Sequence, residues 1–225
     1  FPEAKITYLT GKACAEALAG NPYIDEIRVL EKGNPRFIET ARYLRKKNFD
    51  LAIDLFGNGT SALLSFFSGA KIRVGFNYRF RKYLYNAVVR TDNTGKNAVQ
   101  TYLDVLAFIG LETFTDKTSL FVPQAEKKRA GEILENHFGE KKYLVGLNPG
   151  ASRPAKRWLK ERFAMLADRL AEERDAGIIF FAGPSEKGLL DEIKALVKGD
   201  HLFIEKESLP RVAALIGSCG LFITN

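Results

Sequence analysis

The sequence contains only two cysteines, Cys14 and Cys219, and only two histidines, His137 and His201. The cysteines lie far apart and the histidines lie in unrelated segments, so no disulfide framework, zinc site or haem site is expected. No stretch approaches the ~18 uninterrupted apolar residues of a membrane-spanning helix. With 8 prolines in 225 residues and 46% hydrophobic residues, the chain is neither collagen-like nor disordered. Its function must be sought in the motifs of a globular protein.

The two ends of the sequence are unusual. The first residue is Phe1, and the one methionine, Met165, lies far inside the chain. At the other end, the apolar run Leu221–Thr224 is typical of a buried strand, yet no further element follows to cover it. We therefore expect the protein to extend beyond both ends of this sequence. The alternative for the last run is a short edge strand at the end of a complete protein, which is disfavoured because no charge protects that edge.

Short apolar runs alternate with amphipathic segments along the whole chain. Strands are predicted at residues 5–9, 27–30, 51–56, 72–76, 143–147, 178–182, 202–204 and 221–224. Helices are predicted at residues 12–19, 35–47, 60–67, 99–109, 125–138, 160–173, 186–197 and 208–216. Such alternation predicts α/β architecture, with parallel sheets covered by helices on both faces.

The alternation is interrupted once, near Pro123, where the chain turns polar and helical before a new apolar run begins at Tyr143. We place a domain boundary there, which gives domains at residues 1–122 and 123–225. Two doubly wound units of this kind bind ligands in a cleft at the carboxyl ends of their strands.

The strongest motif is the segment Asn148–Trp158, which lies between a predicted strand and a predicted helix. The positive end of the helix dipole favours an anion at this place, and the small residues Ala151 and Ser152 let backbone amides approach it. Lys156 supplies a mobile positive charge. The alternative is an ordinary loop with solvated bases. We favour ligand binding for Lys156 and packing for Trp158.

A second motif, Gly183–Glu186, follows the next predicted strand. A carboxylate in this position accepts hydrogen bonds from ribose hydroxyls in nucleotide sites, which is the role predicted for Glu186. In the alternative, Ser185 caps the helix and Glu186 merely favours the helix dipole.

A third motif, Gly57–Ala62, formally satisfies the G-x-G-x-x-G/A pattern of dinucleotide sites, and Arg79 is available to meet a 2′-phosphate. An NADP-dependent reductase is therefore an alternative function. It is weakened because the motif does not follow the first strand and the acidic residue of NAD sites is absent downstream.

Residues 71–90 carry six basic and no acidic side chains, interleaved with aromatic residues. This stretch should attract an anionic surface. A non-enzymatic binder of anionic glycan or nucleic acid is thus a further alternative, although no pattern of a known nucleic-acid-binding motif accompanies the charge.

Several of these segments together resemble a known family. Asn148–Trp158 and Gly183–Glu186, with residues 162–164, 21–26, 50–55 and 97–110, are similar to the ADP-heptose:lipopolysaccharide heptosyltransferases, glycosyltransferase family 9, which have the GT-B fold. The resemblance implies transfer of a heptose or related sugar from an ADP-sugar to an acidic lipopolysaccharide core acceptor. It implies no metal, no cofactor beyond the donor substrate and no nucleic-acid partner. It also implies a cytoplasmic location at the inner face of the inner membrane, with peripheral membrane contact.

The resemblance also assigns donor-binding residues. Lys156 and the amides of Ala151 and Ser152 would bind the diphosphate, and Glu186 would contact the ribose. Asn225 would be the start of a second diphosphate-binding loop. The carboxyl-terminal domain would accordingly be incomplete.

On the acceptor side, the resemblance implies that Gly57, Asn58, Arg79 and Arg81 face the acidic core sugar. The family's general base is an aspartate in a loop that would precede Phe1, so no catalytic base is assigned within residues 1–225. We expect the 225-residue form by itself to be inactive.

Overall fold

The computed structural model describes the whole chain except residues 1–2, 32–33, 91–94, 113–114, 140–142 and 184–185. The chain divides into two compact units. The N-terminal unit comprises residues 7–12 and 26–119, and the C-terminal unit comprises residues 1–6, 13–25 and 120–225. The domain limits 1–122 and 123–225 stay a prediction.

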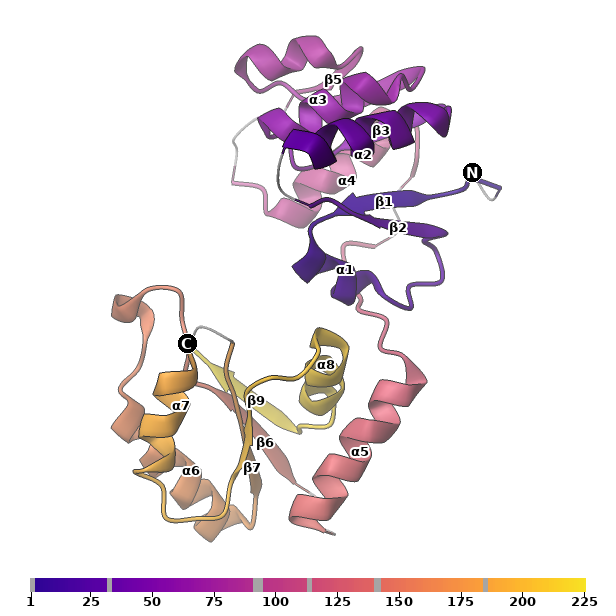
Figure 1. Cartoon of the computed structure of the whole chain (residues 1–225). Coiled ribbons are helices and arrows are strands. Elements are labelled where there is room, and N and C mark those ends of the chain that lie inside the picture. The colour runs from indigo at the N-terminus through magenta and orange to yellow at the C-terminus, as the bar shows by residue number, and fades with distance from the viewer. Residues whose placement is uncertain (1–2, 32–33, 91–94, 113–114, 140–142, 184–185) are drawn as a thin grey trace. The chain divides into compact units, whose positions relative to one another are not determined.

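Strands and helices alternate through both units (Figure 1). The strands are β1 (Thr7–Thr10), β2 (Glu26–Val29), β3 (Leu51–Asp54), β4 (Ile72–Phe76), β5 (Ala87–Val89), β6 (Leu144–Asn148), β7 (Gly177–Phe181), β8 (Leu202–Ile204) and β9 (Leu221–Thr224). The α-helices are α1 (Lys12–Leu18), α2 (Asn34–Lys46), α3 (Gly59–Ser68), α4 (Ala98–Phe108), α5 (Gln124–Phe138), α6 (Lys160–Arg174), α7 (Lys187–Lys194) and α8 (Leu209–Gly217). Two 3₁₀ helices are η1 (Arg79–Leu84) and η2 (Pro154–Lys156).

The C-terminal unit is built on a parallel sheet with strand order β8-β7-β6-β9. Alternate residues of β7 point to opposite faces, so Ile178 and Phe180 pack on one side and Ile179 and Phe181 on the other. Helices α6 and α7 cover the first face, and α5 and α8 cover the second (Figure 1). Every residue of β7 is buried, as expected for a central parallel strand.

The N-terminal unit has two parallel sheets, β1-β2 and β3-β4-β5. Its core is smaller, and the buried apolar cluster of the second sheet consists of Val74, Phe76, Val89 and Val105. Val105 belongs to α4, which packs on β5, while α3 contacts β3 and β4. The parallel α/β organisation predicted from the alternation is therefore confirmed in both units.

The structure differs from the prediction in four places. Strand β5 and the 3₁₀ helices η1 and η2 are not predicted, because three apolar residues between Asn86 and Arg90 are too few to show a period and a 3₁₀ turn has no strong sequence pattern. Strand β9, predicted to be buried, pairs with β6 at one end of the strand order, and its first and last residues, Leu221 and Thr224, are exposed.

Candidate functional site

The carboxyl ends of the C-terminal sheet gather three segments that are far apart in the sequence. Strand β6 lies between β7 and β9, so the loop after β6, residues 149–159, is flanked by Ala182, Gly183 and Glu186 after β7 and by Asn225 after β9. Parallel strands end at the same edge, and this is where open α/β sheets bind ligands. The parallel order thus brings together the donor residues predicted from the sequence.

Asn225 fastens the loop after β6. Its side-chain Nδ2 donates to the carbonyl oxygens of Pro149 at 2.7 Å and Gly150 at 3.3 Å, and its Oδ1 accepts from the backbone N–H of Trp158 at 2.9 Å. One amide side chain therefore joins the two ends of the loop. Both halves of an amide are needed for this, because a carboxylate cannot donate and an amine cannot accept.

Glu186 lies against the same loop. Its carboxylate sits over the Cα of Gly150, where any larger residue would collide with it, and its Oε2 accepts from the N–H of Gly183 at 3.2 Å. The side chain is 14% exposed and lies 3.9 Å from the Arg157 guanidinium. Glu186 is also the N-cap residue of α7 without a side-chain capping bond. Ser185, the alternative cap, lies outside the described residues.

The three cations of the loop have different surroundings. Arg157 is engaged, because its Nε donates to the carbonyl oxygen of Ala151 at 3.0 Å and its guanidinium lies near Glu186. Lys156 and Arg153 are exposed and form no ion pair with any described residue. Lys156 is therefore free to meet a ligand, whereas Arg157 supports the loop.

The helix that follows adds a favourable dipole. Helix α6 starts at Lys160 with Leu159 as its N-cap, and no side chain caps it. Its first N–H groups are thus available to an anion. Trp158, predicted to pack, contacts Phe163 edge-on with ring centroids 5.1 Å apart, yet it is half-exposed. Its ring therefore forms part of the surface beside the loop.

Both histidines lie away from this edge. His201 precedes β8 and is buried, with its Nε2 3.0 Å from Asp168 Oδ1. His137 lies in the last turn of α5 and stacks edge-on against Phe138. Neither side chain is placed to accept a proton at the carboxyl ends of the strands, in agreement with the sequence interpretation.

In the N-terminal unit, the loop after β3 is shaped by a buried carboxylate that the sequence reasoning missed. Asp54 Oδ1 accepts from the N–H of Phe56 at 3.1 Å and of Gly57 at 2.9 Å, and its Oδ2 accepts from the Tyr85 hydroxyl at 2.8 Å. Burial and this hydrogen bond raise the pKa of Tyr85. Gly57 adopts φ +62°, a conformation that favours glycine.

Tyr78 connects this loop with the loop after β4. A Cβ at Gly57 would lie 2.9 Å from the Tyr78 ring, and the Arg81 guanidinium lies 5.5 Å from that ring's centroid. The structure therefore brings Gly57 and Arg81 to one place. Arg79, with φ +41°, is exposed in the same turn.

Asn58 has a structural task within this cluster. Its Oδ1 accepts from the N–H of Ser61 at 2.8 Å, and the Ser61 hydroxyl accepts from the N–H of Asn58 at 3.1 Å. This reciprocal pair is a capping box that starts α3. The G-x-G-x-x-A pattern is thus explained by a glycine turn followed by a helix cap.

The described residues offer neither a metal site nor a membrane-spanning helix. Among them, no group of three or more His, Cys, Asp or Glu side chains is arranged to hold a metal ion. Within the same ranges, no helix has the length and apolar character needed to cross a bilayer.

Comparison with known proteins identifies the family. The family model described as glycosyltransferase family 9 (heptosyltransferase) matches residues 37–225. Lipopolysaccharide heptosyltransferase 3 of Escherichia coli is 25% identical over 241 residues, which cover 99% of this chain and 69% of that protein. Nothing found in these comparisons supports the NADP-dependent reductase.

Solved structures of glycosyltransferases are also similar to this chain. A family 9 glycosyl transferase from Veillonella parvula DSM 2008 has a TM-score of 0.90 at 27% identity, covering 100% of this chain and 67% of that one. E. coli ADP-heptose lps heptosyltransferase II has a TM-score of 0.81 at 23% identity, covering 100% of this chain and 71% of that one. The chain thus spans about two thirds of the length of these relatives and has the GT-B type of α/β fold. It belongs to glycosyltransferase family 9, the heptosyltransferase family.

Proposed function

We propose that the protein transfers a heptose, or a related sugar, from an ADP-sugar to an acidic acceptor in the core of a lipopolysaccharide. The family match and the names of the relatives support this substrate class. No metal and no further cofactor enters the proposal, because the charge of the diphosphate is met by the protein's own cations and backbone dipoles.

The single observation that carries the donor site is the tethered loop after β6. Asn225 fixes the backbone at Pro149 and Trp158, while Arg157 and Glu186 hold the opposite side. A fixed loop in front of an uncapped helix presents its amides without reorganisation when charge develops. Lys156 remains exposed to complete the site.

The chemistry follows from this arrangement. The bond between the anomeric carbon and the diphosphate oxygen breaks, an acceptor hydroxyl forms the new glycosidic bond, and its proton passes to a base. Lys156, the amides of Ala151 and Ser152, and the α6 terminus stabilise the departing diphosphate, while Glu186 binds the ribose. We assign the base to none of residues 1–225.

The loops of the N-terminal unit bind the acceptor in this proposal. Gly57 and Asn58 shape the first loop, and Arg79 and Arg81 supply planar guanidinium donors that suit phosphate and carboxylate groups. Because such an acceptor is anchored to a lipid, we place the protein on the cytoplasmic face of the inner membrane, in peripheral contact with it.

The donor site is tested by ADP binding to the Lys156→Ala variant, measured by calorimetry. Loss of one charge-assisted contact should cost about 2 kcal/mol, or roughly thirtyfold in affinity. Lys127→Ala is the matched control, since Lys127 is an exposed lysine on α5 without an ion pair among the described residues.

Two outcomes would count against the proposal. If the Lys156→Ala and Lys127→Ala variants bind ADP equally well, Lys156 does not contact the ligand and is an ordinary solvated lysine. If the unmodified protein binds NADP and not ADP, the glycosyltransferase site itself is wrong.

A further inference from the structure

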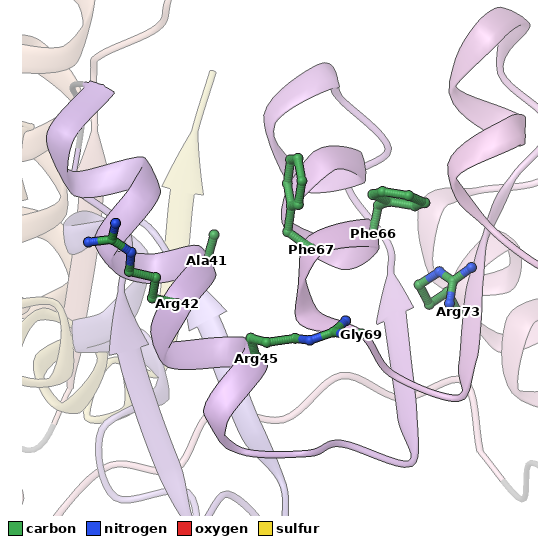
Figure 2. Close-up of a pocket in the computed structure, with 7 residues that line it drawn as sticks. All are labelled: Ala41, Arg42, Arg45, Phe66, Phe67, Gly69 and Arg73. Atoms are coloured by element: carbon green, nitrogen blue, oxygen red, sulfur yellow. The ribbon is translucent and has the colours of Figure 1, made fainter.

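Helices α2 and α3 of the N-terminal unit border an open hollow that neither the donor site nor the acceptor loops use. Its volume is about 560 Å³ (Figure 2). The lining residues are Ala41, Arg42, Arg45, Phe66, Phe67, Gly69 and Arg73. Three of the seven are arginines and none is acidic, so the hollow is positively charged.

None of the three arginines forms an ion pair with an acidic side chain in the described part of the chain. Arg73 donates from Nε to the Leu84 carbonyl at 3.2 Å and from Nη1 to the Ala70 carbonyl at 2.9 Å. Its guanidinium also lies 5.6 Å from the centroid of the Phe66 ring. Arg42 and Arg45 form no ion pair with any residue that the structure describes. Their charges are therefore not neutralised within the described chain.

Two phenylalanines of α3 line the hollow (Figure 2). Phe66 and Phe67 are 44% and 47% exposed and contact each other edge-on, with centroids 5.6 Å apart. The exposed apolar surface continues along both helices, to Ile38 on α2 and Leu63 on α3. Ile38, Arg42 and Arg45 recur at the four- and three-residue spacings of a single helix face, as do Leu63, Phe66 and Phe67.

We propose that this α2–α3 surface, formed by Ile38, Arg42, Arg45, Leu63, Phe66, Phe67 and Arg73, docks the protein on an anionic phospholipid bilayer. Guanidinium groups match lipid phosphates, and exposed aromatic and branched side chains enter the boundary between headgroups and acyl chains. A free phosphate ion would use the arginines but would leave the apolar side chains in water. The inference rests on the proposed function for its lipid-anchored acceptor.

The α2–α3 surface does not include the acceptor loops, but helix α3 connects the two. Helix α3 begins beside the Gly57 loop and ends at Ser68, next to the hollow. Ten helical residues span about 15 Å. A bilayer held at the hollow therefore leaves the acceptor loops within reach of a glycan of a few sugar units that projects from it.

The test is co-sedimentation of the full-length protein with vesicles of phosphatidylglycerol and phosphatidylethanolamine, compared with vesicles of phosphatidylcholine alone. Each arginine near an anionic surface is worth roughly fivefold in partitioning, so Arg42→Gln/Arg45→Gln should weaken binding to the anionic vesicles about thirtyfold. Phe66→Ser should weaken it while retaining the charge. Lys127→Gln/Arg174→Gln removes two exposed charges from the C-terminal unit and should bind like the unmodified protein.

The outcomes separate this inference from the proposed function. If both double variants bind anionic vesicles equally while ADP affinity is intact, the docking surface is wrong and the enzyme assignment stands. If vesicle binding depends on the arginines but ADP binds to no form of the protein, the proposed function fails. If polyglutamate binds the α2–α3 surface and the vesicles do not, the partner is an acidic protein and the bilayer proposal is overturned.

Discussion

The two units present loops at the carboxyl ends of parallel strands but hold them by different means. In the C-terminal unit, apolar clusters fill both faces of one four-stranded sheet, and the loop after β6 rests on that scaffold. In the N-terminal unit, a smaller apolar cluster is supplemented by the buried Asp54–Tyr85 hydrogen bond and by Gly57 packed on Tyr78. The loop after β3 therefore depends more on a few polar contacts and on the backbone conformation of Gly57.

This difference is consistent with the proposal that the C-terminal unit binds the donor and the N-terminal unit binds the acceptor. A nucleotide diphosphate is a constant ligand, and a scaffold with a fixed backbone offers it preorganised dipoles. The loop after β3 rests instead on a few individual contacts, and loops are the segments in which specificity is carried.

The largest effect is expected when an aromatic residue is removed from each core. Phe180 is fully buried and stacks on Phe203 with centroids 4.9 Å apart. Phe180→Ala should lower the free energy of unfolding by about 4 kcal/mol, and Phe76→Ala in the smaller core by about 3 kcal/mol. Urea unfolding monitored by circular dichroism measures both. If Phe76→Ala lowers the free energy of unfolding more than Phe180→Ala does, the C-terminal unit is not the one that depends more on its apolar core.

The next effect concerns Gly57, in the loop after β3. Gly57→Ala combines a left-handed backbone with a clash against Tyr78, for a cost of about 3 kcal/mol. Gly95→Ala is the matched control, since Gly95 has φ +70° but open space around its Cα. It should cost about 1 kcal/mol. Equal losses in urea unfolding would show that the Tyr78 contact is unimportant.

The hydrogen bond between Tyr85 and Asp54 should contribute less. Tyr85→Phe leaves a buried carboxylate oxygen without its donor, at a cost of about 2 kcal/mol at pH 7. Because the pKa of Tyr85 is raised in the folded state, this stabilisation is complete below about pH 10 and declines as pH rises further. Unfolding measured at pH 7 and pH 10.5 should show a smaller difference between the two proteins at the higher pH.

Tyr83→Phe provides the control for that experiment. Tyr83 is exposed, and its hydroxyl makes no hydrogen bond with the described residues. A loss of stability similar to that of Tyr85→Phe would mean that the buried bond does not support the loop.

The smallest effect is expected at Asp168 in the C-terminal unit, far from the donor loop. Burial opposes ionisation of this carboxyl, but hydrogen bonds from Gly199 and His201 outweigh it and lower the pKa of Asp168. Its contribution is thus present above about pH 4 and lost as pH falls through the lowered pKa. Asp168→Asn should cost about 1 kcal/mol at pH 7 and less at pH 3, measured by urea unfolding. A difference that grew towards acid would contradict this sign.

Much of the candidate site could be predicted from the sequence. The loops around Lys156, Glu186 and Gly57 each follow an apolar run and precede a helical period, and both features are local. The supporting contacts could not be predicted in this way. Nothing near Asn225 in the sequence indicates that its amide ties Pro149 to Trp158, because these residues are 67 to 76 positions away.

The sequence by itself determined the alternation of strands and helices and the family, because these depend on local periodicity and on short motifs. The tertiary structure decided which loop residues are engaged and which are free. Arg157 and Lys156 are adjacent cations, yet only Arg157 faces a carboxylate and a carbonyl group. The strand order β8-β7-β6-β9 makes this distinction, since it places the segments after β7 and β9 on either side of the loop after β6. Non-local pairing of parallel strands leaves no trace in the spacing of residues along the chain.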